Sequence, residues 1–169
     1  MLPIQGMAHF PFQRGCLYIW NDLEKCNIPD IQGVYQHALG IMVISLRQRY
    51  AGHAKQAALI AAGSWGAERS RFIITVDEDI DPSNIQQVLW AMATRCEPER
   101  DVEVVKECWI GSIDPGVPQV ERLRSNFTTG RVIINACRPI YRRGEFPRVV
   151  TAGPEAKATA LKRWWDAIK

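Results

Sequence analysis

Apolar residues in the centre of the chain fall into two short runs with little polar alternation. Segments 40–46 (GIMVISL) and 70–76 (SRFIITV) are dominated by β-branched and other aliphatic side chains. This pattern is typical of strands that are buried on both faces of a sheet. Segments 101–106 (DVEVVK) and 130–136 (GRVIINA) are two further strand candidates, and 28–38 predicts a turn followed by a short strand.

Helical patterns separate these strands. Segment 50–65 is rich in alanine, and small side chains allow a helix to pack close to a sheet. Segment 81–94 (DPSNIQQVLWAMAT) predicts a helix that is capped by Asp81 and has Pro82 at its first position. Its expected buried positions follow the spacing i, i+3, i+4, i+7 and are Ile85, Val88, Leu89 and Met92.

Two more helices are predicted near the ends of the chain. Segment 17–27 places Ile19, Leu23 and Cys26 on one face. Segment 154–169 forms an apolar stripe from Leu161, Trp164, Trp165 and Ile168. Alternating strands and helices predict a three-layer α/β/α domain with a mostly parallel or mixed sheet. Residues 1–16 show no periodicity and are expected to form an irregular arm, so the domain would span 17–169.

Composition limits the classes of protein to which this chain can belong. The 169 residues are 47% hydrophobic and 23% charged, as in globular domains. A net charge of +3 without long basic runs argues against nucleic-acid binding. The five cysteines show no metal-binding or redox spacing, so we expect reduced thiols in a cytoplasmic protein. No apolar run reaches the roughly 18 residues of a membrane span.

The first candidate site follows the strand at 40–46. Arg47 and Arg49 are two residues apart on extended backbone and should point to the same side. The alanine-rich helix begins beside them, near Gly52 and His53, with its free amide groups and positive dipole end. Guanidinium groups beside a helix N-terminus can bind phosphate or carboxylate. The alternative is that both arginines are solvated or make surface ion pairs.

The second candidate site is the acidic segment 77–82 (DEDIDP), which follows the strand at 70–76. Its carboxylates could bind a metal or perform acid–base chemistry. The alternative is structural, with Asp81 capping a helix and the other acids pairing with arginines.

Several motifs occur in an order that resembles the C-terminal domain of the UbiD family. They are VISLRQRYAGHAKQAAL, VDEDIDPSNIQQVLWAMATRCEPERDVEVV and SIDPGVP, followed by IINACRPIYR and EFPRV. UbiD enzymes are reversible decarboxylases of aromatic and α,β-unsaturated acids that use prenylated flavin mononucleotide. The resemblance covers roughly residues 17–169.

The resemblance also assigns roles. In the family, a basic residue near this strand end reaches the flavin phosphate, so Arg47 or Arg49, Gly52 and His53 are the expected cofactor-binding residues. The middle domain of the family carries the Mn²⁺ and K⁺ ligands and the catalytic arginine and acids, and no segment here resembles it. The resemblance therefore assigns no catalytic or metal-binding residue to this chain and implies that the chain is inactive alone.

The implied partners are the remaining UbiD-like domains, in cis or as a separate subunit, an aromatic or unsaturated acid and, indirectly, a prenylated-flavin synthase. In the family the terminal region packs on a neighbouring subunit, which implies a homo- or hetero-oligomer through helix 154–169. Two alternatives remain open. The chain could be an assembly module that binds no cofactor, or an independent protein that binds a phosphate ligand.

Overall fold

The computed structural model describes residues 13–38, 40–112, 114–147, 149–150 and 152–168, and only the backbone of 166–168. Its helices are α1 (Arg14–Lys25), α2 (His53–Gly63), α3 (Ile85–Arg95), α4 (Pro98–Asp101), α5 (Gln119–Leu123) and α6 (Pro154–Ile168), with 3₁₀ turns η2 (Trp65–Ala67) and η3 (Ile140–Arg142). Its strands are β1 (Ile31–His37), β2 (Ile41–Leu46), β3 (Phe72–Asp77), β4 (Val102–Trp109) and β5 (Thr128–Ala136).

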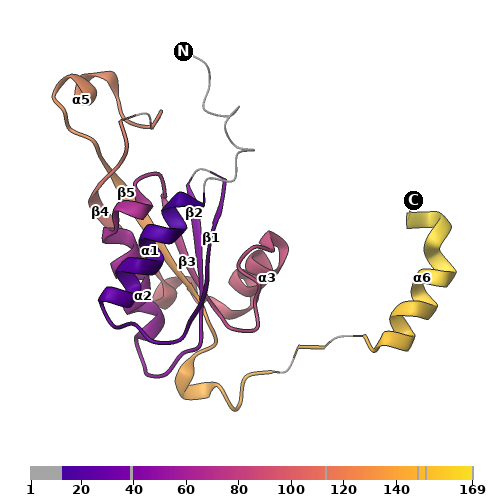
Figure 1. Cartoon of the computed structure of the whole chain (residues 1–169). Helices are drawn as coiled ribbons and strands as arrows, with labels where there is room; N and C mark the ends of the chain where they lie inside the picture. Colours follow the sequence, from indigo (N-terminus) through magenta and orange to yellow (C-terminus); the bar gives the residue numbers. More distant parts are fainter. Residues whose placement is uncertain (1–12, 39, 113, 148, 151, 169) are drawn as a thin grey trace.

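The strands form one mixed sheet in the order β1-β2-β3-β5-β4. The three central strands β2, β3 and β5 are parallel, and the two edge strands β1 and β4 are antiparallel to their neighbours. Helices α1 and α2 cover one face and α3 covers the other (Figure 1). The predicted three-layer α/β/α fold with a mixed sheet is therefore confirmed.

The alanine-rich pattern of α2 has the predicted effect. Its alanines face the sheet and are 0–3% exposed, namely Ala54, Ala57, Ala58, Ala61 and Ala62. They pack with Met42, Ile44 and Ile73 in the core cluster between the sheet and helices α1 and α2. A second cluster, which includes Val43, Ile74 and Val88, fills the space under α3. Because β2 contributes to both clusters, its unbroken apolar run is explained.

Some helix boundaries and faces differ from the predictions. Helix α1 begins at Arg14, so residues 14–16 of the expected irregular arm are helical, while 1–12 lie outside the described residues. Cys26 follows the end of α1 and is exposed, and Cys16 takes the expected place beside Ile19 in the core. The predicted extent of the domain, residues 17–169, otherwise stays a prediction.

Helix α3 also begins later than predicted. Its cap is Asn84, whose side-chain oxygen accepts hydrogen bonds from the amides of Gln86 and Gln87 at 3.1 and 3.2 Å. The Asp81 carboxylate instead accepts from Ser83, which closes a turn before the helix. Val88, Ala91 and Arg95 are buried, and Met92 is partly buried against the same cluster. Ile85 and Leu89 are exposed, contrary to the prediction.

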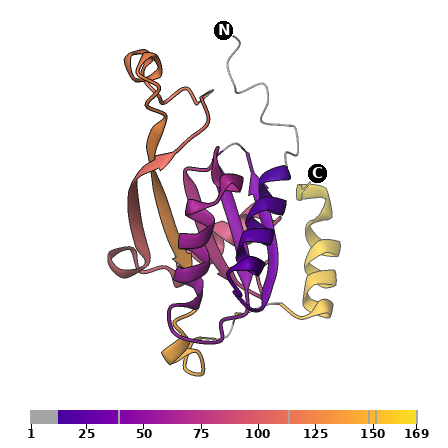
Figure 2. The ribbon, with the colours of Figure 1, turned by 60° about the vertical axis from the view of Figure 1, so that its left-hand side comes forward.

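Helix α6 stands apart from the sheet and its covering helices (Figure 2). The side chains of its apolar stripe are about half exposed, with Leu161 at 50%, Trp164 at 55% and Trp165 at 53%. The side chain of Ile168 lies outside the described residues. The stripe therefore does not complete the core of its own domain. Among the described residues, no helix is both long and apolar enough to cross a membrane.

We predict that replacing Gly66 by alanine destabilises the fold by about 2 kcal/mol, because overpacking of this kind costs roughly 1–3 kcal/mol. A Cβ at Gly66 would collide with the Gly15 carbonyl and lie 2.9 Å from Ile19 Cγ1, where α1 crosses η2. Gly63→Ala is the matched control, since its Cβ would meet nothing within 4 Å. Urea unfolding should show a loss only for Gly66→Ala, and equal midpoints for both variants would contradict the prediction.

Candidate functional site

The carboxyl ends of β2, β3 and β5 lie at one edge of the sheet because these strands are parallel. Leu46 pairs with Asp77, and Val76 pairs with Ala136, so the three strands end nearly level. The antiparallel strand β1 starts at the same edge, with Ile31 opposite Leu46. The segments after residues 46, 77 and 136 and the residue before β1 therefore meet here. In open α/β sheets this edge is where ligands usually bind.

Burial alternates along the segment that leaves β2. Arg47 and Arg49 are exposed, whereas Gln48 between them is 8% exposed and turns inward. The extended backbone predicted this alternation for the two arginines. It also places an amide side chain, which the sequence reasoning did not consider, into the interior of the edge.

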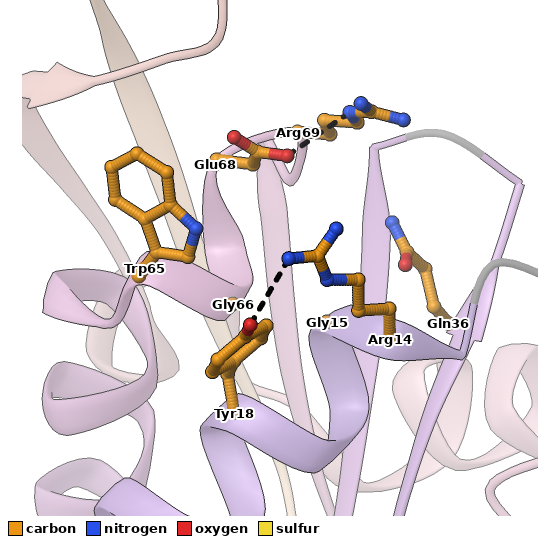
Figure 3. A pocket seen from close by; sticks show the side chains of 8 residues that line it. All are labelled: Arg14, Gly15, Tyr18, Gln36, Trp65, Gly66, Glu68 and Arg69. Atoms are coloured by element: carbon orange, nitrogen blue, oxygen red, sulfur yellow. Dashed lines mark hydrogen bonds and ion pairs between the residues drawn. The ribbon is translucent and has the colours of Figure 1, made fainter.

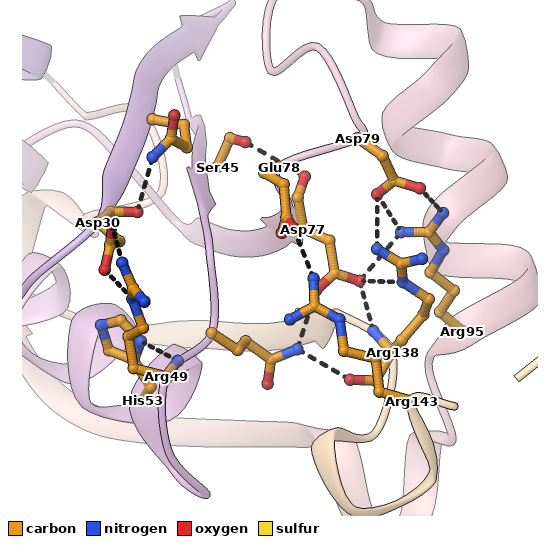
Figure 4. Close-up of polar contacts among 12 residues, drawn as sticks. Asp30, Ser45, Arg49, His53, Asp77, Glu78, Asp79, Arg95, Arg138 and Arg143 are labelled. Carbon is orange, nitrogen blue, oxygen red and sulfur yellow. Dashed lines mark hydrogen bonds and ion pairs between the residues drawn. The ribbon is translucent and has the colours of Figure 1, made fainter. Parts of the chain in front are cut away.

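Arg49 has a partner within the chain. Its guanidinium donates to both carboxylate oxygens of Asp30, the residue before β1 (Figure 4). Arg49 lowers the pKa of Asp30 by this hydrogen bond, and the carboxylate in turn raises the pKa of Arg49. The solvated or ion-paired alternative therefore describes Arg49, whose charge is already balanced.

His53 lies under the same turn and is completely buried. Its Nδ1 accepts a hydrogen bond from the Arg49 amide at 3.2 Å, and its ring stacks on Tyr50 with centroids 4.6 Å apart. Burial lowers the pKa of His53, although the Pro29 carbonyl and the Asp30 charge oppose this. The neutral ring therefore holds the turn, and its Nε2 has no hydrogen-bond partner among the described residues.

Helix α2 begins at His53 without a side-chain cap. Its N-cap residue is Gly52, with φ of +87°, a conformation that favours glycine. A Cβ at Gly52 would meet nothing within 4 Å, so the space beside this turn is open. The Arg47 side chain is exposed and makes no hydrogen bond or ion pair within the described ranges, although its charge helps to lower the pKa of Asp30. An unpaired guanidinium and an uncapped helix N-terminus thus share one open edge.

Asp77, at the end of β3, is the centre of a buried polar network (Figure 4). One carboxylate oxygen accepts from Gln48 Nε2 at 2.9 Å. The other accepts from Arg95 Nη1 at 3.1 Å and from the amide and Nε of Arg138 at 2.7 and 3.1 Å. The side chain of Asp77 is 0% exposed and that of Arg95 is 1% exposed. This one carboxylate therefore ties together the ends of β2 and β3, helix α3 and the segment after β5.

The other acids of segment 77–82 extend the network outward. Asp79 forms two hydrogen bonds with Arg95 at 2.9 and 2.8 Å, and Glu78 pairs with Arg143. Burial acts to lower the pKa of Arg95, but the two aspartates outweigh it and raise that pKa. Arg95 in turn lowers the pKa of Asp79. The acids therefore have the structural role that was the alternative to metal or acid–base chemistry. Among the described residues no cluster of three or more His, Cys, Asp or Glu side chains could hold a metal ion.

Sequence reasoning missed the inner members of this edge, namely Asp30, Gln48, Arg95 and Arg138. A weak signal existed for Gln48, because alternation after a buried strand places every second residue inward. Arg138 reaches Asp77 because β5 lies next to β3 in the sheet, and Arg95 reaches it because α3 packs over the sheet.

Two hollows lie toward the opposite, amino edge of the sheet. One of about 250 Å³ is lined by Arg14, Tyr18 and Gln36 among others, and Trp65 and Glu68 also border it (Figure 3). The other, of about 370 Å³, lies under Trp65 and Trp109, whose rings stack with centroids 4.5 Å apart. Neither includes a residue of the predicted site.

The fold and this polar strand end define a three-layer α/β domain of the kind that presents its carboxyl edge to a ligand. Residues 16–136 match the family model of the 3-octaprenyl-4-hydroxybenzoate carboxy-lyase C-terminal domain. The chain therefore belongs to the UbiD C-terminal domain family, as its motifs indicated.

Relatives and solved structures agree with this assignment. The chain is 32% identical over 153 residues to a phenolic acid decarboxylase of Escherichia coli O157:H7, covering 87% of the chain and 30% of that protein. A phenolic acid decarboxylase of Sedimentibacter hydroxybenzoicus is 33% identical, and the match covers 65% of this chain and 22% of that protein. The chain thus spans less than a third of the length of these relatives.

Among solved structures, the apo 3,4-dihydroxybenzoic acid decarboxylase of Klebsiella pneumoniae aligns with a TM-score of 0.70 at 25% identity, covering 88% of this chain and 32% of that one. The UbiD-class enzyme HmfF from Pelotomaculum thermopropionicum, in complex with FMN, gives a TM-score of 0.70 at 24% identity, with coverage of 83% and 31%. Because its identity is only 24%, the likeness to HmfF supports the fold alone.

We predict that Asp77→Ala lowers the free energy of unfolding by about 3–5 kcal/mol, because removing one member of a buried ion pair leaves the other charge uncompensated. The measurement is urea unfolding followed by circular dichroism. Asp77→Asn keeps an acceptor and should lose less, which provides a folded variant if alanine is not tolerated.

The matched control is Glu145→Ala. Glu145 makes an exposed pair with Arg142 at 3.7 Å, and such surface pairs contribute about 0–1 kcal/mol. The role of Asp77 is refuted if both its variants unfold at the same urea concentration as Glu145→Ala.

Proposed function

We propose that this chain is the cofactor-facing C-terminal part of a UbiD-like decarboxylase that binds prenylated FMN and acts on an aromatic or α,β-unsaturated carboxylic acid. The observation that carries the proposal is the unpaired Arg47 beside the uncapped start of α2. Both features favour an anion, and the phosphate of a flavin mononucleotide is one. The family and the names of the relatives supply the reaction class.

Charge balance favours Arg47 over Arg49 as the phosphate contact. Arg49 is held by Asp30, and the arginines near Asp77 are each matched by an acid. A phosphate at Arg49 would have to displace a bidentate carboxylate, whereas at Arg47 it displaces only water. Gly52 then leaves room for the ligand, and the buried His53 supports the turn from beneath without itself reaching the ligand.

The bound flavin would supply the electron sink for decarboxylation. This chain would supply binding and orientation. Arg47 and the first amides of α2 would fix the phosphate end, and the domain would cover the ring system and exclude water. The family places the Mn²⁺ and K⁺ ligands and the catalytic arginine and acids in its middle domain, so we propose that the isolated chain is inactive. The remaining domains would come in cis or as a separate, cytoplasmic partner.

We predict that Arg47→Ala weakens FMN binding by about tenfold or more in the enzyme assembled from this chain and its remaining domains, since a lost charge-assisted hydrogen bond costs roughly 1.5–3 kcal/mol. Flavin fluorescence gives the dissociation constant, and riboflavin, which lacks the phosphate, should bind both forms equally.

Arg49→Ala is the matched control and should weaken FMN binding much less. If Arg47→Ala binds FMN as tightly as the unmodified enzyme, the proposed phosphate site is wrong. A larger loss for Arg49→Ala would assign the phosphate to Arg49 and reject the charge-balance argument.

A second candidate function is assembly, favoured by helix α6. Its stripe of Leu161, Trp164 and Trp165 is about half exposed and stands away from the sheet. Aromatic side chains of this kind are enriched at the energetic centres of interfaces. We propose that α6 buries the stripe on another subunit, which would make the protein an oligomer whether or not it binds a cofactor.

We predict that truncation after Gly153 converts an oligomer into a folded monomer, because none of the described α6 side chains, up to Trp165, belongs to either core cluster. Light scattering at micromolar concentration gives the mass, and circular dichroism verifies folding. Trp164→Glu should have the same effect, whereas Lys157→Glu, also exposed on α6, should leave the mass unchanged. An intact chain that is already monomeric, or a truncated chain that unfolds, would reject this role.

A further inference from the structure

Gln48 is placed between the two arginines of the candidate site but faces the opposite way. It is 8% exposed, and its Nε2 donates two hydrogen bonds, to Asp77 Oδ1 at 2.9 Å and to the Arg138 carbonyl at 2.8 Å. Both amide hydrogens are therefore used. The side chain joins the end of β2 to the end of β3 and to the segment that follows β5.

The chemistry of these two partners restricts the residue at position 48. A carboxylate and a carbonyl are both acceptors, so the side chain between them has to donate twice. A glutamate of the same length would place a second acceptor, and a second negative charge, against them. A methionine of similar length would fill the space and leave the Arg138 carbonyl without this donor. Only an amide or a cationic side chain meets both requirements.

The position of Gln48 controls the direction of its neighbours. Arg47 carries the proposed phosphate contact and makes no hydrogen bond or ion pair with its side chain among the described residues, so only its backbone holds it in place. On one side, the Arg47 amide donates to the Asp30 carbonyl at 2.9 Å. On the other side, the two hydrogen bonds of Gln48 fix the chain. Arg49 and His53 hold the turn that follows, so loss of the Gln48 bonds would loosen the chain chiefly at Arg47.

We propose that Gln48 is a positioning residue for the flavin phosphate, which acts by holding Arg47 toward the open space beside Gly52. This inference rests on the proposed function. The buried carboxylate of Asp77 thereby transmits the fixed geometry of the sheet to Arg47 at its edge. Gln48 itself does not touch the ligand, because its side chain turns inward and both hydrogens of Nε2 are bonded inside the domain.

The test uses the enzyme assembled from this chain and its remaining domains, with FMN and riboflavin as probes. Gln48→Met removes both donated hydrogen bonds and should weaken FMN binding by about fivefold or more, because a misplaced Arg47 would lose most of one charge-assisted contact with the phosphate; riboflavin binding should stay unchanged. Gln48→Lys, which restores both donors, should bind FMN within about threefold of the unmodified enzyme. Gln86→Met makes the same chemical change on the exposed surface of α3 and should bind like the unmodified enzyme.

A second readout needs no flavin. Amide hydrogen exchange of the 169-residue chain should show faster exchange at residues 47–52 in Gln48→Met, with unchanged exchange in β3 and β5. Gln48→Asn keeps the amide but is one methylene too short to reach both acceptors. It should behave like Gln48→Met and replaces that variant if the latter does not fold.

The outcomes separate this inference from the function on which it rests. If Arg47→Ala weakens FMN binding and Gln48→Met does not, Gln48 has no positioning role and the proposed site stands. If Gln48→Met weakens FMN and riboflavin equally, or Gln48→Lys loses as much as Gln48→Met, the effect is general and the inference is overturned. If Arg47→Ala has no effect, the proposed phosphate site fails and the inference fails with it.

Discussion

The buried carboxylate of Asp77 is the constraint on which the carboxyl edge of this domain depends. A charge that is buried away from water is stable only where partners surround it. Here the partners come from the segment after β2, from α3 and from the segment after β5. If any of these groups moved, a buried charge or donor would be left without a partner. The free-energy cost of that is far larger than the net free energy gained when the pair is satisfied. The edge is therefore fixed in one arrangement, with specificity rather than added stability as the benefit.

That arrangement also decides which charges remain for a ligand. The acids of segment 77–82 pair inward with Arg95, Arg138 and Arg143, and Asp30 pairs with Arg49. Among the described residues, Arg47 forms no ion pair of its own, although its charge also acts on Asp30. An arginine without a directly bonded acid, on the same edge as an uncapped helix start, is thus a consequence of how the neighbouring charges are satisfied. Counting basic residues in the sequence would not have distinguished it from Arg49.

The sequence predicted what depends on local pattern. The apolar runs identified β2 and β3, the small residues identified the packing of α2, and alternation placed both Arg47 and Arg49 on the exposed side. The features that the sequence did not predict depend on contacts between distant residues, or on two nearby residues that could each serve as the helix cap. Both Asp81 and Asn84 can cap a helix, and Ser83 decides between them by occupying the Asp81 carboxylate. The pairing of Arg49 follows from the antiparallel register of β1, which brings Asp30 to the edge. The family was evident from the order of the motifs, whereas the roles of single residues needed the sheet order.

Two exposed features of the described residues have different chemistry. At the carboxyl edge it is a charge, Arg47, on the same edge as the uncapped start of α2. On α6 it is an apolar stripe, clear of the sheet. A charge favours an anion and an apolar stripe favours another protein surface, so one partner does not account for both. The proposed function fits this separation, because the chain spans only 22–30% of two relatives and the two proposed contacts, with a flavin phosphate at the edge and with another subunit at α6, use different surfaces. The interior of the domain is complete without either, so binding at one surface need not rearrange the other.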